Sequence, residues 1–519
     1  MSSGQTAALG ELRAARRRRF VERLDVMEVL YRVYLAAIFG GIALVVIAGW
    51  VEEAPATAAA VADMKEHGPA VLGLALALAV LVGLRSGSRG GPLAIEAAEV
   101  QYVLLAPIDR GAALRPAAWR QLRIAVLAGA VLGAVVGNFV FRRLPGSPVG
   151  WIVCLALFGA LLPVCALAAA LLGSGRRLRP LVASAIGAAL VAWSLADLLL
   201  GATTSPATMA GELGTLPLQS GESHLVLAAA GLAIALALTG LGLRAAGRIA
   251  LEAARRRAAL TAELRFSASV QDLRTVVLLR RQLASERPRR RPWIRLGVAS
   301  ARHPVWRRGW QSFLRWPLGR LARVLAIAVA AGAATAGAWS GVTLLFVLPG
   351  ALLMVAALDL VEPLAQEADH PTRRELLPVP VDTLMQRHLG PSFAAMATVL
   401  LVGVATALAL GAPTTVAAVG AVTLVPTALV LACCAGLSAT NDPYRYVLTP
   451  QLGYVQSAAP VVIAVVAAGG PVLAAREAAR HGGSAVGAAI GIEVAMLLIG
   501  VAMAWWLGRR MAEQSAVAP

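Results

Sequence analysis

The sequence predicts an all-α protein embedded in a membrane, and three observations support that prediction. Of the 519 residues, 58% are hydrophobic and only 14% are charged, and the mean hydropathy of +0.73 is higher than a water-soluble domain tolerates. The hydrophobic residues gather in windows of about 20, the length that crosses about 30 Å of hydrocarbon as a helix. A helix also satisfies its backbone polar groups within one segment, so helices are the expected spanning elements.

These windows predict about twelve transmembrane spans, six in each half of the chain. In the first half they lie near 33–51, 69–85, 121–141, 149–173, 180–200 and 223–243. In the second half they lie near 321–339, 342–361, 393–411, 414–438, 456–474 and 484–507. The polar, arginine-rich N-terminus lacks a convincing cleavage site, so the first span is expected to stay as an anchor.

The predicted organisation therefore has three parts. Residues 1–243 form a first six-helix half with an N-terminal elbow helix, 244–305 form a basic cytoplasmic linker, and 306–519 form a second six-helix half. Positively charged short loops stay in the cytoplasm, so arginine clusters orient the bundle. Those clusters are Arg13 with Arg16 to Arg19 before the first span, Arg176, Arg177 and Arg179 in an internal loop, and Arg509 with Arg510 after the last span. Both termini are predicted to be cytoplasmic, in a bacterial plasma membrane.

Two pairs of arginines fall outside in this topology, so the span boundaries near them stay open. They are Arg142 with Arg143 and Arg476 with Arg480, at 142–148 and 471–484.

Composition excludes several activities. The net charge is +19, yet Lys65 is the only lysine, and a Walker A loop needs a lysine to reach the nucleotide phosphates. The basic residues lie beside apolar spans, which favours the positive-inside rule over nucleic-acid binding. The cysteines lie in apolar stretches without zinc or redox spacing, and we interpret them as small buried hydrophobic residues; they are Cys154, Cys165, Cys433 and Cys434. No catalytic, metal or cofactor site is predicted in this chain.

An internal repeat relates the two halves. Residues 92–114 read PLAIEAAEVQYVLLAPIDRGAAL, and residues 363–384 read PLAQEADHPTRRELLPVPVDTL. The matched pairs are Pro92 with Pro363, Glu96 with Glu367, Pro107 with Pro380, and Asp109 with Asp382. Pro163 and Pro426 each lie ten residues before a glycine in the fourth and tenth spans. Both matches predict one six-helix unit used twice in parallel, about a pseudo-twofold axis along the membrane normal.

The repeated segment lies between the second and third spans of each half, on the predicted cytoplasmic side. Its acids, apolar residues and proline predict a short interfacial helix followed by a turn. Such a helix is placed to enter a groove on a cytoplasmic partner. The alternative is a helix at the lipid headgroups that meets no partner.

At these residues the chain resembles the ABC-2 type exporter permeases, of the fused twelve-span kind common in high-GC actinobacterial genomes. The resemblance implies coupling helices that contact ABC ATPase subunits, either two copies of one or a heterodimer, which bind ATP and Mg²⁺. It also implies elbow helices at Arg16–Tyr34 and Trp306–Val324 and outward transport of a hydrophobic or amphipathic drug, natural product, lipid or peptide. The implied coupling residues are Glu96, Glu99, Pro107, Asp109, Arg110, Glu367, Asp369, Pro380 and Asp382.

Two other functions stay open. A proton-coupled twelve-span secondary transporter needs ionisable groups inside the membrane, and Asp197, Asp359 and Glu493 are candidates. Glu493 and Asp197 are possible cavity-lining residues, and Glu493 is equally well interpreted as a structural carboxylate with a polar partner. A membrane glycosyltransferase is suggested by Glu52 and Glu53 in the first external loop, although any solvated loop carries such a pair.

Overall fold

The computed structural model describes most of both halves of the chain. The described residues are 55–88, 109–249, 303–341, 343–369, 379–440 and 450–517, with residues 11, 93, 252, 255, 258–260, 262–264, 279 and 288–295. All regular structure in these residues is helical. The chain divides into two compact units, unit 1 (Met1–Glu263) and unit 2 (Leu264–Pro519), and each is described by itself.

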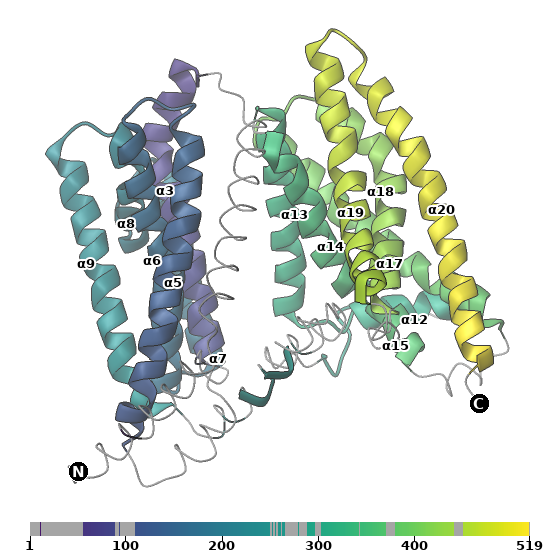
Figure 1. Cartoon of the computed structure of the whole chain (residues 1–519), viewed down its shortest axis with the longest axis horizontal. Coiled ribbons are helices and arrows are strands. Elements are labelled where there is room, and N and C mark those ends of the chain that lie inside the picture. Colours follow the sequence, from purple (N-terminus) through teal and green to yellow (C-terminus); the bar gives the residue numbers. More distant parts are fainter. Residues whose placement is uncertain are drawn as a thin grey trace. The chain divides into compact units, whose positions relative to one another are not determined.

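Ten helices in the described residues are long and apolar enough to cross a membrane (Figure 1), which confirms the predicted polytopic all-α class. In unit 1 they are α3 (Ala58–Gly87), α5 (Arg110–Val140), α6 (Pro148–Gly175), α7 (Pro180–Leu200) and α9 (Glu222–Ala245). In unit 2 they are α13 (Leu318–Trp339), α17 (Val381–Ala409), α18 (Thr415–Ala439), α19 (Pro450–Arg480) and α20 (Ala485–Val517).

Two of the twelve predicted spans are not among these ten. The first, 33–51, lies outside the described residues. The eighth, 342–361, is a 3₁₀ turn (Thr343–Phe346) followed by the 14-residue helix α14 (Val347–Leu360). The number twelve therefore stays a prediction.

Helix ends explain the two uncertain boundaries. Helix α5 ends at Val140, and α6 starts at Pro148 after the N-cap Ser147, whose hydroxyl accepts from the Gly150 N–H at 3.0 Å. Helix α19 continues to Arg480 instead of ending near 474. Arg476 and Arg480 are thus helical residues and do not belong to a loop.

Glycines let the helices of unit 1 approach backbone to backbone. Gly129, Gly133 and Gly137 form a small-residue stripe on α5 that lies against α6. A Cβ atom at Gly133 would lie 2.0 Å from the carbonyl oxygen of Leu155, a separation that no side chain can adopt. Helix α3 approaches α6 in the same way at Gly83. Close van der Waals packing of this kind holds helices together where lipid removes most of the hydrophobic driving force.

The two units share part of their packing. In unit 1, α6 packs against α3, α5 and α9, and α3 also packs against α7. In unit 2, α18 packs against α14, α17 and α20, and α14 also packs against α19. Helix α19 of unit 2 also packs against α18 and α20, whereas α7 makes no comparable packing with α6 or α9 among the described residues of unit 1.

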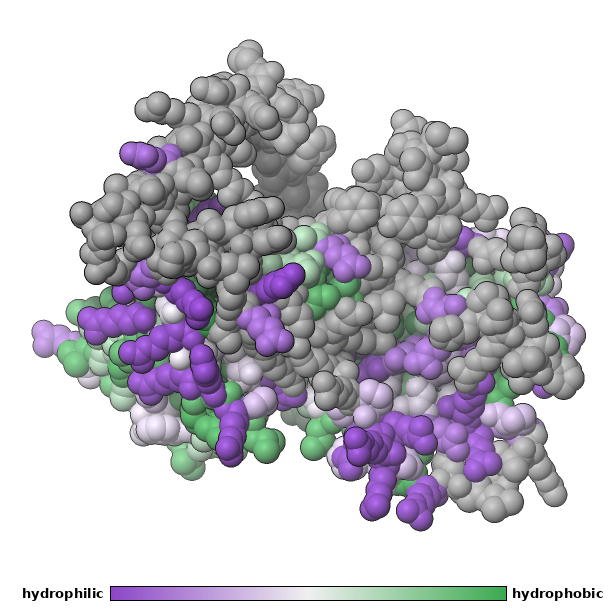
Figure 2. All heavy atoms as spheres, turned by 90° about the horizontal axis from the view of Figure 1, so that it is seen from below, coloured by the Kyte–Doolittle hydropathy of each residue, from purple (hydrophilic) through white to green (hydrophobic). Residues whose placement is uncertain are grey.

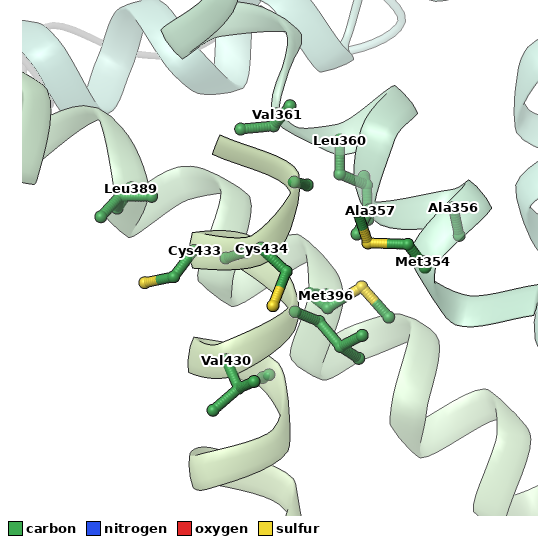
Figure 3. Close-up of a cluster of buried hydrophobic side chains, with 14 of the residues drawn as sticks. Met354, Ala356, Ala357, Leu360, Val361, Leu389, Met396, Val430, Cys433 and Cys434 are labelled. Atoms are coloured by element: carbon green, nitrogen blue, oxygen red, sulfur yellow. The ribbon is translucent and has the colours of Figure 1, made fainter. Parts of the chain in front are cut away.

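The core of unit 2 is built from small and flexible side chains. Met354 and Ala357 of α14, Met396 of α17 and Cys434 of α18 meet in one cluster (Figure 3). Cys433 and Cys434 are fully buried and Cys165 is buried in unit 1, whereas Cys154 is half-buried. Unbranched methionine fills the irregular spaces that small neighbours leave.

Unit 1 contains a short helix that the sequence analysis missed. Helix α8 (Pro206–Thr215) lies in the connection 201–222 between the predicted spans 180–200 and 223–243, and it packs between α3, α6 and α9. Gly73 of α3 lies against the backbone of Thr208, and Gly231 of α9 lies against Ala210. The loop therefore folds back into the bundle.

Arginines gather at one end of unit 1, where α6 and α9 finish and α5 and α7 begin. Hydrophilic side chains collect on this end of the unit (Figure 2). The exposed arginines there are Arg110, Arg176, Arg177, Arg179, Arg244 and Arg248.

The substitution Gly133→Ala tests the close approach of α5 and α6. The new methyl group meets backbone and cannot be accommodated by a rotamer change, so we expect a loss of about 1–3 kcal/mol in stability. Gly240→Ala on α9 is the matched control, because no atom lies within 4 Å of its added Cβ and alanine favours the helix. Thermal melting of the purified protein in detergent compares the two, and equal melting temperatures would contradict the packing.

Candidate functional site

A short helix lies where the repeat predicts an interfacial helix in unit 2. Helix α15 (Glu362–Asp369) follows α14 directly and is bent from it by 51°. It precedes α17, so it lies between the predicted second and third spans of that half. The predicted short helix is therefore present in the second copy. The segment of the first copy, apart from Leu93 and Asp109, lies outside the described residues before α5.

One ion pair joins α15 to the helix that precedes the first apolar helix of unit 2. That preceding helix, α12 (Pro304–Phe313), overlaps the first part of the range Trp306–Val324 expected for the elbow. Arg308 of α12 donates to Glu367 of α15 with 2.5 Å between Nη2 and Oε1. The Glu367 side chain is 1% exposed and that of Arg308 is 35% exposed. A buried carboxylate is costly without a partner, so this pair fixes α15 against α12.

A second group of charges joins the start of α13 to the end of α14. Arg323 donates to one carboxylate oxygen of Asp359 from Nε at 3.0 Å and from Nη2 at 2.8 Å. Arg320 donates to the Asp359 carbonyl at 2.5 Å and to the carboxylate of Glu362, the first residue of α15. Asp359 is fully buried. Both guanidinium groups thus bind the corner where α14 turns into α15.

Aromatic rings anchor α12 beside this corner. Trp306, Trp310, Phe313 and Trp316 follow one another in edge-to-face contacts with centroids 5.1–6.0 Å apart. The guanidinium of Arg320 lies 3.8 Å from the Trp316 ring centroid. The row of rings therefore links α12 to Arg320, which binds Asp359 and Glu362 where α14 turns into α15.

The predicted coupling residues of the second copy occupy different environments. Glu367 is buried and forms the ion pair with Arg308 inside the unit. Asp369, the last residue of α15, is exposed. Pro380 is exposed and immediately precedes α17, and Asp382 is half-buried in the first turn of that helix. Of the three acids, Asp369 is the one whose side chain is exposed to solvent.

In the first copy, Asp109 has a local structural role. It is the N-cap of α5, and its carboxylate accepts from the N–H groups of Gly111 and Ala112, both at 3.1 Å. Asp109 and Arg110 are exposed. The remaining predicted residues, Glu96, Glu99 and Pro107, lie outside the described residues.

Asp197 holds the start of α8. Its carboxylate accepts from the Ser205 N–H at 2.7 Å, from the Thr204 N–H at 3.2 Å and from the Thr204 hydroxyl at 2.5 Å. The residue is 2% exposed. These bonds satisfy backbone donors at a helix start, so capping accounts for the buried charge.

Glu212 lies on α8 and is fully buried. His224, at the start of α9, approaches it with 3.2 Å between Nδ1 and Oε2. Burial raises the pKa of Glu212, and the neighbouring imidazole opposes that rise. This pair joins α8 to α9.

Glu493 of α20 is 2% exposed. Its Oε1 lies 3.2 Å from the hydroxyl oxygen of Thr427 on α18. Thr427 also lines a cavity of about 60 Å³ between α13, α14, α17, α18 and α19. The cavity wall is mostly apolar, with the hydroxyls of Thr335, Thr423 and Thr427 as its polar groups. Glu493 itself is not on the cavity wall.

Sequence reasoning missed the basic partners of these acids. Arg308, Arg320 and Arg323 were counted as positive charge beside a span, because their positions fit the positive-inside rule. A weak signal was present, since Arg320 and Arg323 recur three residues apart at the start of an apolar helix and therefore share a face.

Comparisons with known proteins give no family for this chain. No family profile matches it, and no curated protein matches it. A crystal structure of MATE in complex with MaL6 is 13% identical over 91% of this chain and 93% of that chain, with a TM-score of 0.31. A likeness at this TM-score carries no argument about the fold or the function.

Arg308→Ala is expected to destabilise unit 2, because it leaves the Glu367 carboxylate buried without its cation. Breaking a buried pair in this way costs about 2–5 kcal/mol. Adding Glu367→Gln to Arg308→Ala should recover part of the loss, since the uncompensated charge is removed. Arg315→Ala is the control, because Arg315 is exposed and lies two residues after the end of α12. A melting temperature of Arg308→Ala equal to that of the control would mean that the ion pair contributes nothing.

Asp109 can be tested for capping separately from charge. Asp109→Ala removes the acceptor for two N–H groups and should cost about 1 kcal/mol, whereas Asp109→Asn keeps a good N-cap and should cost only a few tenths. Melting temperatures of the two variants give the comparison. Equal destabilisation by both would show that the charge, and not the cap, matters for stability.

Proposed function

We propose that this chain is the membrane permease of an ABC-type exporter and that separate ATPase subunits drive it. One observation carries the proposal: α15 projects from α14 at 51° and is braced from inside by Arg308 and Arg320. A helix that only rests at the lipid headgroups needs no such bracing. A helix that receives force from a partner does.

Two further observations support the proposal. Several helix pairs of unit 1 have counterparts in unit 2, which is compatible with a duplicated six-helix unit that has one coupling segment in each copy. Lys65 is the only lysine, so ATP hydrolysis by a Walker A loop would have to be supplied by another chain.

The contacts suggest how force would travel through unit 2. Movement of α15 pulls α12 through Glu367 and Arg308, and it pulls the start of α13 through Glu362 and Arg320. Ion pairs between buried groups transmit such movement because separating them is costly. The partner contact itself would be made by Asp369 and Asp382, whose charges suit basic residues on an ATPase.

In this proposal both termini and both coupling segments are cytoplasmic, in a bacterial plasma membrane. ATP and Mg²⁺ bind to the ATPase subunits. The substrate in this proposal is a hydrophobic or amphipathic molecule that moves outward, as the resemblance to exporter permeases implies.

The double charge reversal Asp369→Arg with Asp382→Arg tests the coupling assignment. We expect the ATPase subunit to dissociate and substrate-stimulated ATP hydrolysis by the co-purified complex to fall at least about tenfold, which corresponds to about 1.4 kcal/mol. Glu222→Arg, at an exposed position on α9 of unit 1, is the matched charge reversal and should leave assembly unchanged. Melting temperatures of all variants separate lost coupling from lost folding.

Three outcomes would overturn the proposal. The first is unchanged assembly and ATP hydrolysis in the double variant, which would remove the coupling role from α15 and α17. The second is the absence of any associated ATPase. The third is transport that stops when the proton gradient collapses and does not need ATP, which would favour a proton-coupled secondary transporter.

A further inference from the structure

A proline in α19 leaves one backbone carbonyl without its helical donor. In an α-helix the carbonyl of residue i accepts from the N–H of residue i+4. For Ala467 that residue is Pro471, which has no N–H. The Thr427 hydroxyl of α18 supplies the missing bond and donates to the Ala467 carbonyl at 2.9 Å.

This bond limits what Thr427 can donate to Glu493. A hydroxyl has a single proton to donate, and Thr427 uses it for the Ala467 carbonyl. The Thr427 oxygen also lies 3.2 Å from Oε1 of Glu493. One proton cannot serve the Ala467 carbonyl and a Glu493 carboxylate fully at the same time, whereas a protonated Glu493 can donate to the Thr427 oxygen. In that arrangement Glu493 is a neutral carboxylic acid.

The surroundings of Glu493 agree with a neutral acid. The residue is 2% exposed, and an ionised carboxylate is expensive in an apolar interior. Within the described part of the chain, no cation forms an ion pair with it, and its Oε2 has no hydrogen-bond partner.

Helix α20 packs against α17, α18 and α19, and their ionisable groups lie elsewhere along those helices. Those whose side chains are described are Asp382, Arg387 and His388 near the start of α17, Cys433 and Cys434 on α18, and Arg476, Glu477 and Arg480 near the end of α19.

We propose that Glu493 is a proton-binding site of unit 2 and that its protonated form joins α20 to α18 and α19 through Thr427. Thr427 and Ala468 are also on the wall of the 60 Å³ cavity, so that cavity lies one side chain away from Glu493. When Glu493 ionises, it gives its proton to solvent, and the carboxylate then competes with the Ala467 carbonyl for the one Thr427 proton. Loss of the proton therefore loosens the contact between α20 and its neighbours. This inference does not depend on the proposed function.

Infrared spectroscopy tests the assignment on the purified full-length chain. At about pH 7, well above the ordinary glutamate pKa of about 4.3, the wild-type spectrum minus that of Glu493→Gln should contain the carbonyl stretch of a protonated carboxylic acid. That band should disappear at alkaline pH. The glutamine amide can still donate to Thr427, so the variant is expected to fold. Glu212 is unchanged in both proteins and cancels in the difference. A difference spectrum that contains a carboxylate band at pH 7 instead would overturn the proposal.

Pro471→Ala gives a second, directional test. It returns an N–H to α19 that can bond the Ala467 carbonyl, which frees the Thr427 hydroxyl to donate to a Glu493 carboxylate. The midpoint at which the protonated band is lost should move to lower pH by about one unit, as expected when a carboxylate gains one hydrogen bond. Pro460→Ala, at the other proline within α19, is the matched control and should leave the midpoint unchanged. An unchanged midpoint in a folded Pro471→Ala protein would show that Thr427 does not set the protonation of Glu493. If that variant does not fold, the difference spectrum of Glu493→Gln still decides the protonation state.

Discussion

A chain this apolar must satisfy its buried polar groups from within, because lipid offers them no partner. That constraint accounts for the contacts on which unit 2 depends. Asp359 is fully buried and is bound by Arg320 and Arg323, and Glu367 is bound by Arg308. Each of these contacts also joins two helices. The same contacts therefore neutralise the buried acids and hold α12, α13, α14 and α15 together.

The same constraint explains helix starts and close approaches in unit 1. Asp197 binds the N–H groups at the start of α8, so a short helix can lie inside the bundle without exposing its backbone donors. Glycines on α3, α5 and α9 then allow backbones to approach closely. The connection 201–222 is therefore packed inside unit 1, with its backbone donors bound by Asp197 and its helix in contact with small residues.

The short helix α15 carries one buried acid and one exposed acid only two residues apart. Glu367 matches Glu96 in the repeat, and its carboxylate is already used inside unit 2. Asp369 lies two residues further along the same helix and is exposed. A repeated acidic motif is therefore not one functional surface, because neighbouring positions on a helix point in different directions. In the proposed exporter, Glu367 positions the coupling helix and Asp369 contacts the partner.

The membrane class, most of the span positions and a short helix between α14 and α17 could be predicted from the sequence, because they follow from hydrophobic length and local breaks along the chain. It also indicated Asp197, Asp359 and Glu493 as unusual, since charge inside a span is rare. The roles of these three acids follow from contacts between distant helices. Asp197 caps α8, Asp359 pairs with arginines of α13, and Glu493 meets a threonine whose proton is directed by Pro471 on a third helix. These partners lie between 7 and 66 residues away, and a one-dimensional pattern carries no information about which distant side chain fills a given gap.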